Sequence, residues 1–149
     1  MQKFLFAALI CLFCFTSCKK DQDEEDRELI EQYIADNGLN AQSLASGLYY
    51  VIDEAGSGGA PTTSNEVDVY YKGSLLNGTV FDETDPQGNP LTILLGATIQ
   101  GWQEGIPLFE KGGKGLLLIP SSLGYGSRAV GSIPANSVLI FEIELVDFN

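Results

Sequence analysis

The spacing of hydrophobic and polar positions changes several times along this chain. Residues 4–15 form an unbroken apolar run, whereas residues 19–26 are all charged except for one glutamine. Residues 26–38 then place four apolar side chains at helical spacing among acidic ones, and an Asn-Gly pair ends the stretch. From residue 47 onward, apolar residues alternate or cluster in short stretches, which indicates β-strands. The chain therefore divides into an apolar leader, a charged segment and a strand-rich part.

The charged segment predicts two different structures. Residues 19–26 are typical of a solvated tether. Residues 26–38 predict one short amphipathic helix, with Leu29, Ile30, Tyr33 and Ile34 on its apolar side. That side must dock on another part of the molecule. Residues 39–46 are then expected to form a polar connector.

The strand-rich part predicts an antiparallel arrangement of about five strands. Val67, Val69 and Tyr71 share one face of a strand, and Asn77-Gly78 favours a tight hairpin that leads from it to residues 79–81. In the last stretch, residues 137–148, four alternate apolar side chains are expected to face inward, and Glu142 and Glu144 outward. Together with the two short helices expected over residues 26–38 and around Trp102, this pattern predicts the α+β class.

The leader has the features of an export signal over residues 1–17. Lys3 supplies the basic start, and the apolar run that follows is too short for a good membrane-spanning helix. Cys18 directly follows a small residue, which resembles the lipobox of bacterial lipoproteins, in which this cysteine becomes the acylated first residue. An ordinary signal peptide with an incidental cysteine is the alternative. We expect lipidation at Cys18 and a cell-envelope location, on the periplasmic side or on the outer surface.

Composition excludes several kinds of function. The 20 acidic residues against 8 basic ones give a formal net charge of −12, which argues against binding to nucleic acid or to anionic lipid. Without histidine, the chain has no Ser-His-Asp triad and none of the usual zinc sites. Cys11 and Cys14 lie in the leader, so the exported chain keeps one cysteine and forms no disulfide. We therefore expect no metal and no cofactor.

The only tryptophan lies in an unfavourable place for a helix. Trp102 stands in "IQGWQEGIP", between Gly101 and Gly105. A helix this short is not stable alone in water, and glycine weakens it further. The stretch therefore needs support from the surrounding structure, and Gly101 is expected to allow a tight backbone turn beneath the indole.

Several separated motifs occur in an order that resembles one known family. "VYYKGSLLNGTVFDET", "ILLG", "IQGWQEGI", "GGKGLLLIPSSLGYG" and "IPANSVLIFEIELV" together resemble the FK506-binding-protein family of peptidyl-prolyl isomerases, from about Gly47 to Phe148. The resemblance implies a twisted antiparallel sheet of about five strands wrapped around one short helix. It divides the chain into a signal peptide (1–17), an acidic lipidated tether with a short helix (18–46) and an isomerase domain (47–149).

The resemblance also implies a site and roles within it. Trp102 would form the floor of a proline-binding pocket, and Asp82 would be a partly buried carboxylate acting electrostatically near the imide. The Ile99 backbone N–H and the Tyr125 hydroxyl would hold substrate carbonyls. The remaining pocket residues would be the aromatic walls Tyr71, Phe81 and Phe141 and the loop residue that closes the top, Ile133. Of these, the catalytic set would be Asp82, Trp102, Tyr125 and Phe141.

Three positions depart from the family pattern. Leu91 stands where a phenylalanine often lines the pocket, Thr98 replaces an aliphatic residue, and Leu123 stands where an aromatic residue is common. Leu91 and Thr98 remain predicted substrate-binding residues. We expect these changes to weaken the rim of the pocket more than its floor.

The expected function is that of a lipid-anchored prolyl isomerase that helps exported proteins fold. Rotation about an X–Pro bond needs neither a nucleophile nor a metal, so the missing residue types are compatible with it. Its partners would be proline-containing polypeptides and FK506-type macrolides, and the short segment before Gly47 favours a monomer. Two alternatives remain: a non-catalytic peptide-binding or chaperone module on the same fold, and a calcium-binding surface protein based on the acidic segment.

Overall fold

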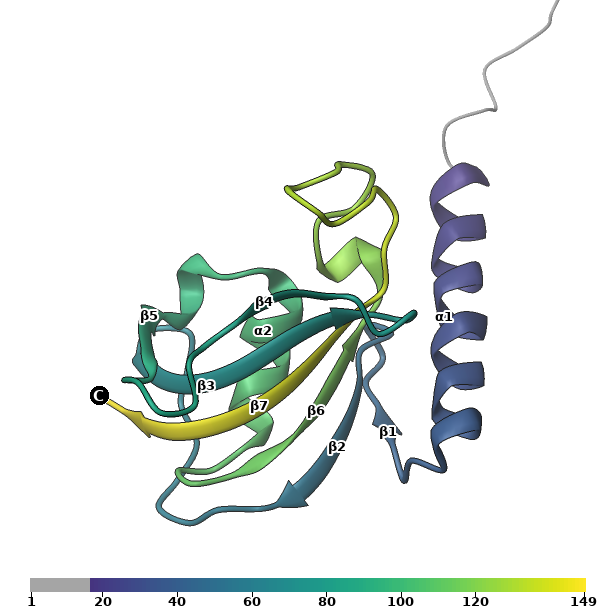
Figure 1. Cartoon of the computed structure of the whole chain (residues 1–149). Coiled ribbons are helices and arrows are strands. Elements are labelled where there is room, and N and C mark those ends of the chain that lie inside the picture. The colour runs from purple at the N-terminus through teal and green to yellow at the C-terminus, as the bar shows by residue number, and fades with distance from the viewer. Residues whose placement is uncertain (1–16) are drawn as a thin grey trace, which may run out of the picture.

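The computed structural model describes residues 17–149, so the predicted leader lies outside the described residues except for Ser17. The described part is an α+β domain built on one antiparallel sheet (Figure 1). Its helices and strands, in chain order, are α1 (Ser17–Asn37), β1 (Gln42–Ser43), β2 (Tyr49–Glu54), β3 (Glu66–Leu75), β4 (Val80–Glu83), β5 (Leu91–Leu94), η1 (Leu95–Ala97), α2 (Gln100–Gly105), η2 (Ile106–Leu108), β6 (Lys114–Ile119), η3 (Ser121–Leu123) and β7 (Leu139–Phe148).

The strand order places the last strand in the middle of the sheet. The order is β1-β2-β6-β7-β3-β4, and β5 pairs with β3 as well. One edge of β3 pairs with β7, while its other edge pairs with β5 near its start and with β4 near its end. Within residues 17–149 the sheet therefore has seven strands, where about five were predicted, and β1 lies within residues 39–46, where only a polar connector was expected. The predicted Asn77-Gly78 hairpin is confirmed, since Gly78 has a φ of 84° between β3 and β4.

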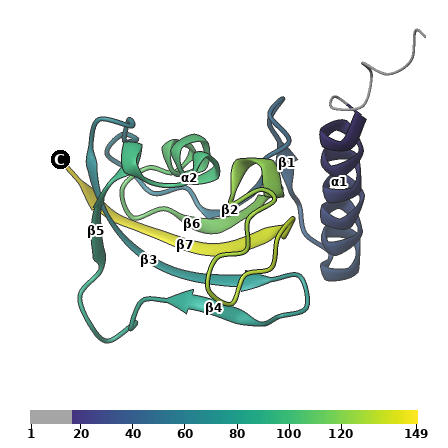
Figure 2. The same ribbon diagram turned by 90° about the horizontal axis from the view of Figure 1, so that it is seen from above.

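Helix α2 lies inside the curve of the sheet (Figure 2). A Cβ atom added at Gly101 would lie 2.5 Å from Cγ2 of Ile119, and one added at Gly105 would lie 2.6 Å from Cδ1 of Leu117. Both contacts are too close for a real side chain, so the two glycines let the helix lie directly on β6. The predicted role of Gly101 in a tight turn is therefore wrong: the glycine allows close packing between helix and sheet. This packing stabilises a helix of only six residues.

The main core fills the space between α2 and the concave face of the sheet. Val67 and Val69 of β3 are fully buried there. The inward face predicted for the last strand is confirmed by the burial of its alternate residues, Leu139, Phe141, Ile143 and Leu145. Trp102 is 5% exposed and belongs to the same core. The short helix thus brings the largest apolar side chain of the chain onto the sheet.

Helix α1 differs from the prediction in length and agrees with it in packing. It begins at Ser17, so residues 19–26 are helical and do not form an extended tether. The predicted docking of its apolar side is confirmed, because Ile30 is fully buried in a second cluster with Leu118, Val138 and Ile140. Leu118 and Ile140 alternate with core residues along β6 and β7, so α1 packs on the other face of the sheet from α2. None of the described helices combines the length and apolar character needed to cross a bilayer.

Candidate active site

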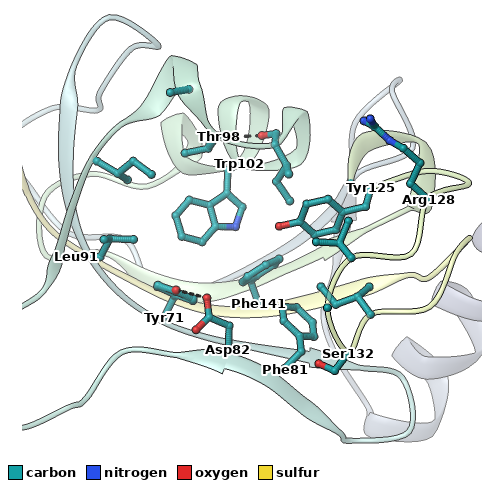
Figure 3. Close-up of a pocket in the computed structure, with 17 residues that line it drawn as sticks. Tyr71, Phe81, Asp82, Leu91, Thr98, Trp102, Tyr125, Arg128, Ser132 and Phe141 are labelled. Carbon is teal, nitrogen blue, oxygen red and sulfur yellow. Dashed lines mark hydrogen bonds between the residues drawn. The ribbon is translucent and has the colours of Figure 1, made fainter.

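An open pocket of about 640 Å³ lies between α2, the concave face of the sheet and the loop that follows η3 (Figure 3). It brings together residues from β3, β4, β5, α2, β7 and that loop. All ten pocket residues predicted from the sequence line it: Tyr71, Phe81, Asp82, Leu91, Thr98, Ile99, Trp102, Tyr125, Ile133 and Phe141. Cys18, the predicted lipidation site, is not among the lining residues, and its side chain lies outside the described part of the structure.

Four aromatic rings form the bottom and one wall of the pocket. The ring of Phe141 contacts those of Trp102, Phe81 and Tyr71, with centroids 5.3, 5.5 and 6.1 Å away. The planes of Trp102 and Phe81 lie at 81° and 80° to that of Phe141, and Tyr71 meets Trp102 at 79°. Edge-to-face contacts of this kind are favourable beyond the area that they bury. The rings therefore fix one another.

Gly73 makes this ring arrangement possible. It lies on β3 and pairs with Phe141 on β7 on one side and with Asp82 on β4 on the other. A Cβ atom at this position would lie 2.4 Å from Cε2 of Phe81 and 2.9 Å from Cε1 of Phe141. The two rings thus occupy the space that a side chain at position 73 would need. Sequence reasoning did not identify this role; Gly73 two positions after Tyr71, facing the same way, was the available signal.

The Trp102 indole carries an unpaired polar group. Within the described residues, Nε1 of Trp102 is the one buried side-chain nitrogen or oxygen without a hydrogen-bond partner. Figure 3 shows the indole between the aromatic rings and the loop that carries Tyr125. Leaving a buried donor unsatisfied typically costs about 1–3 kcal/mol, so such groups are rare away from functional sites.

Asp82 and Tyr71 form a hydrogen-bonded pair on one side of the pocket. The Tyr71 hydroxyl donates to Oδ2 of Asp82 over 2.6 Å (Figure 3). Asp82 is exposed, so the expectation of a partly buried carboxylate is wrong: β4 is an edge strand, and its side chain meets solvent at the mouth of the pocket. Burial, together with the hydrogen bond to the carboxylate, raises the pKa of the Tyr71 phenol well above its ordinary value. The phenol therefore stays a donor and holds Asp82 in place.

Two further donors at the rim have no partner within residues 17–149. The Ile99 N–H precedes α2 and donates to no protein acceptor, and the Tyr125 hydroxyl makes no hydrogen bond. Thr98 is different, because its hydroxyl donates to the Leu95 carbonyl over 2.7 Å. The backbone carbonyl of Thr98 accepts a 2.7 Å hydrogen bond from the Gln103 side chain. The threonine that departs from the family pattern thus braces the start of α2.

Sequence reasoning missed part of the lining and misplaced one residue. The unexpected lining residues are Ile93, Ala97, Gly124, Arg128, Val130, Gly131 and Ser132. Most belong to the loop between Tyr125 and Ile133, and their position between two predicted residues was the only signal. Leu123 does not line the pocket; it is 7% exposed in the main core, so its departure from the family pattern affects packing and not the rim. Residues 17–149 contain no group of three or more His, Cys, Asp or Glu placed to hold a metal ion.

The fold and the pocket agree with a comparison against known families. Residues 58–146 match the family described as FKBP-type peptidyl-prolyl cis-trans isomerase. The match spans more than half of the chain, and the chain belongs to this family.

Curated relatives carry the same family name. The chain is 42% identical over 127 residues to the FKBP-type peptidyl-prolyl cis-trans isomerase FkpA of Escherichia coli strain K12, covering 85% of this chain and 46% of the relative. It is 45% identical over 134 residues to FkpA of Buchnera aphidicola subsp. Schizaphis graminum, covering 89% of this chain and 52% of the relative. The chain thus spans about half the length of these curated relatives.

Solved structures show the same fold. The crystal structure of FkpA from Escherichia coli superposes with a TM-score of 0.76 at 38% identity, over 89% of this chain and 63% of the other. A peptidyl-prolyl cis-trans isomerase from Pseudomonas syringae gives a TM-score of 0.75 at 29% identity, over 88% of this chain and 96% of the other. AtFKBP13 gives 0.68 at 35% identity, over 74% and 99% of the two chains.

Proposed function

We propose that this chain catalyses cis–trans isomerisation of X–Pro bonds in polypeptides. One observation carries the proposal: an open pocket with four aromatic rings at its base presents three donors without a partner, from Ile99, Trp102 and Tyr125. A proline ring fits the apolar base, and the flanking carbonyls of an extended peptide supply the missing acceptors. The membership of the chain in the isomerase family supports the same reaction.

The chemistry of the bond explains why such a pocket suffices. Resonance gives the amide C–N bond partial double-bond character and a rotational barrier of about 18–20 kcal/mol. Twisting the bond breaks this resonance, so the imide nitrogen gains electron density and the carbonyl loses polarity. A site that binds the twisted form better than either planar form lowers the barrier without a covalent step. An apolar pocket favours the less polar twisted imide by excluding water from it.

Each side chain has a role in this proposal. The indole of Trp102 supports the proline ring, and the rings of Phe141, Phe81 and Tyr71 enclose it. The Ile99 N–H and the Tyr125 hydroxyl donate to peptide carbonyls on either side of the proline. Asp82, fixed by the Tyr71 hydroxyl, places a negative charge beside the carbonyl carbon of the twisting imide. The same surfaces would bind FK506-type macrolides.

The expected substrates are exported proteins during folding. The basic start, the apolar run and the cysteine after a small residue support a cleaved leader over residues 1–17 and a lipid anchor at Cys18 in the cell envelope. Residues 18–46 then carry α1, and residues 47–149 form the isomerase domain. We further propose that the protein acts as a monomer without a cofactor.

An isomer-specific peptide assay tests the activity. The purified protein should accelerate isomerisation of X–Pro peptides, and an FK506-type macrolide should abolish the acceleration. Asp82→Asn should leave stability nearly unchanged while lowering kcat/KM, because it removes the charge and hardly changes the volume. A protein that binds the macrolide but gives no rate above the uncatalysed reaction, with several residues before proline, would instead be a binding module.

A separate experiment tests the lipid anchor. Cys18→Ala should move the protein from the membrane fraction to the soluble fraction. Several acyl chains on Cys18 would anchor the protein firmly, and without them the acidic chain would not be attracted to anionic lipid. The wild type should also incorporate labelled fatty acid. If the variant stays with membranes and the wild type takes up no label, Cys18 is not lipidated.

A further inference from the structure

Asp26 of helix α1 differs in burial from the other described acidic residues of the helix. Asp26 is fully buried, whereas the other described acidic residues of α1 are exposed. Its Oδ2 accepts hydrogen bonds from the Ser121 backbone N–H over 2.7 Å and from the Ser121 hydroxyl over 2.5 Å. Its Oδ1 accepts a 2.9 Å bond from the Gln22 side chain. A buried carboxylate is costly unless it is hydrogen-bonded in this way, so this contact is specific.

The partner of Asp26 is the first residue of η3, which leads into the rim of the pocket. The Ser121 carbonyl accepts hydrogen bonds from the N–H of Gly124 over 3.0 Å and from the N–H of Gly126 over 2.8 Å. These two glycines flank Tyr125, whose hydroxyl lies at the pocket. The Gly126 carbonyl accepts a further 2.8 Å bond from the Asn136 N–H, on the returning side of the loop. Ser121 is therefore the point from which the turn around Tyr125 is held.

The two sets of contacts form a continuous connection from α1 to the substrate site. Asp26 accepts hydrogen bonds from the backbone N–H and the hydroxyl of Ser121, and the Ser121 carbonyl holds the turn that presents Tyr125. Helix α1 is held in turn by Ile30, one helical turn further along the same side, in the cluster on the outer face of the sheet. The helix lies wholly before residues 58–146, the part that matches the family.

We propose that Asp26 is a positioning residue for the isomerase site, and that α1 is a working part of that site. By holding Ser121, the Asp26 carboxylate restricts the turn that orients the Tyr125 hydroxyl toward the peptide. The aromatic base of the pocket does not depend on this contact, because its rings come from β3, β4, α2 and β7. This inference rests on the proposed isomerase function, and one of its readouts is independent of activity.

The central experiment is a double-mutant cycle in the full chain. Asp26→Ala should lower kcat/KM for X–Pro peptides roughly two- to tenfold, as expected for weakening one hydrogen bond to the substrate, mainly through a higher KM. In a Tyr125→Phe background the same substitution should have little further effect, because the group that it positions is gone. Asp36→Ala, which removes an exposed carboxylate from the same helix, is the matched control and should leave kcat/KM unchanged.

An activity-independent readout separates this inference from the proposed function. Asp26→Ala should speed hydrogen exchange at the Gly124 and Gly126 amides, while the exchange of β3 and β7 amides and the fluorescence of Trp102 stay as in the wild type. These measurements hold even if the protein proves to be a binding module without turnover. In that case, macrolide affinity replaces kcat/KM in the cycle.

Several results would overturn the inference. It is wrong if Asp26→Ala keeps the wild-type kcat/KM, or if its loss is undiminished in the Tyr125→Phe background, which would indicate general destabilisation. If Asp26→Ala does not fold, Ser121→Ala decides, because it removes the hydroxyl donor and keeps the backbone bond. Ser121→Ala should then give a smaller loss in the same direction, coupled to Tyr125, and an unchanged kcat/KM would refute the role of the contact.

Discussion

The base and the rim of the pocket are built in opposite ways. The base consists of side chains from the sheet and from α2, and its two central rings, Trp102 and Phe141, are 5% and 4% exposed. Most of the rim is the loop between η3 and β7, with exposed residues such as Arg128 and with Val130 42% exposed. Backbone hydrogen bonds hold this loop, including the reciprocal pair between Val130 and Ile133 at its tip.

The difference separates two properties that are often treated together. Residues of the base contribute to the core, so changing them alters stability and substrate binding at once. Most residues of the loop contribute little to burial, although Ile133 is 6% exposed and belongs to the main core. Changing the exposed loop residues should therefore alter substrate binding with the fold intact. If the chain binds X–Pro peptides as proposed, its selectivity among them can vary through changes in the rim, while its binding of the proline ring is tied to the stability of the domain.

The largest effect is expected at Trp102. Trp102→Ala should lower the free energy of unfolding by about 3–5 kcal/mol, through lost burial and the cavity that remains. It should also abolish macrolide binding. Urea denaturation followed by circular dichroism measures the first effect, and in the wild type the single indole should change its fluorescence when the macrolide binds. A stability loss below about 1 kcal/mol would show that Trp102 contributes little to the core, and that the base of the pocket does not differ from the rim in this respect.

A smaller effect is expected at Gly73. Gly73→Ala places a methyl group where the Phe81 and Phe141 rings lie, so we expect a loss of about 1–3 kcal/mol from overpacking and weaker macrolide binding. Ser74→Ala, on the next position of β3, is the control and should change stability by less than about 0.5 kcal/mol. Equal stability of the two variants would show that the rings move aside without cost.

Tyr71 joins the base of the pocket to the exposed Asp82, and its phenol makes the stability of the domain depend on pH. Tyr71→Phe should cost about 0.5–1.5 kcal/mol, the usual range for one hydrogen bond. Because folding raises the pKa of the Tyr71 phenol, its contribution to stability is fully present below the ordinary value of 10.0 and is lost as pH rises toward the folded value. Denaturation at increasing alkaline pH should therefore show a steeper decline for the wild type than for Tyr71→Phe. Parallel declines would mean that the phenol titrates normally.

The smallest effect on stability is expected at Tyr125. Its hydroxyl has no partner within residues 17–149, so Tyr125→Phe should change the free energy of unfolding by less than about 0.5 kcal/mol. Its KM for peptides should nevertheless rise, because one donor to the substrate is lost. Steady-state kinetics measure this rise. A clear loss of stability at this position would show that the rim belongs to the core.

The base of the pocket could be predicted from the sequence more completely than the rim. Its residues stand in strands with clear alternation or in the motif around Trp102, so pattern and family resemblance specify them together. The loop residues Arg128 and Val130 carry no periodicity, and only the folded backbone places them at the pocket. The exposure of Asp82 depends on β4 being an edge strand, and strand order is not encoded in the local pattern.

Helix α1 shows a second limit of sequence reasoning. A run of charged residues is typical of a solvated segment, yet residues 19–26 belong to helix α1, which packs on the sheet through Ile30. Asp26 appears within that run as one acidic residue among several. Its burial depends on Ser121, 95 residues further along the chain, and no local signal connects the two.

The position of β7 restricts how the domain can fold. Residues 139–148 pair with β6 on one side and with β3 on the other, so they join the β1-β2-β6 part of the sheet to the part that contains β3, β4 and β5. Before these residues emerge from the ribosome, the two parts have no strand between them, and Trp102 lacks Phe141 as its neighbour. Contacts between distant segments make such topologies slow to fold. A protein proposed to speed the folding of others therefore assembles its own site only after its last strand has arrived.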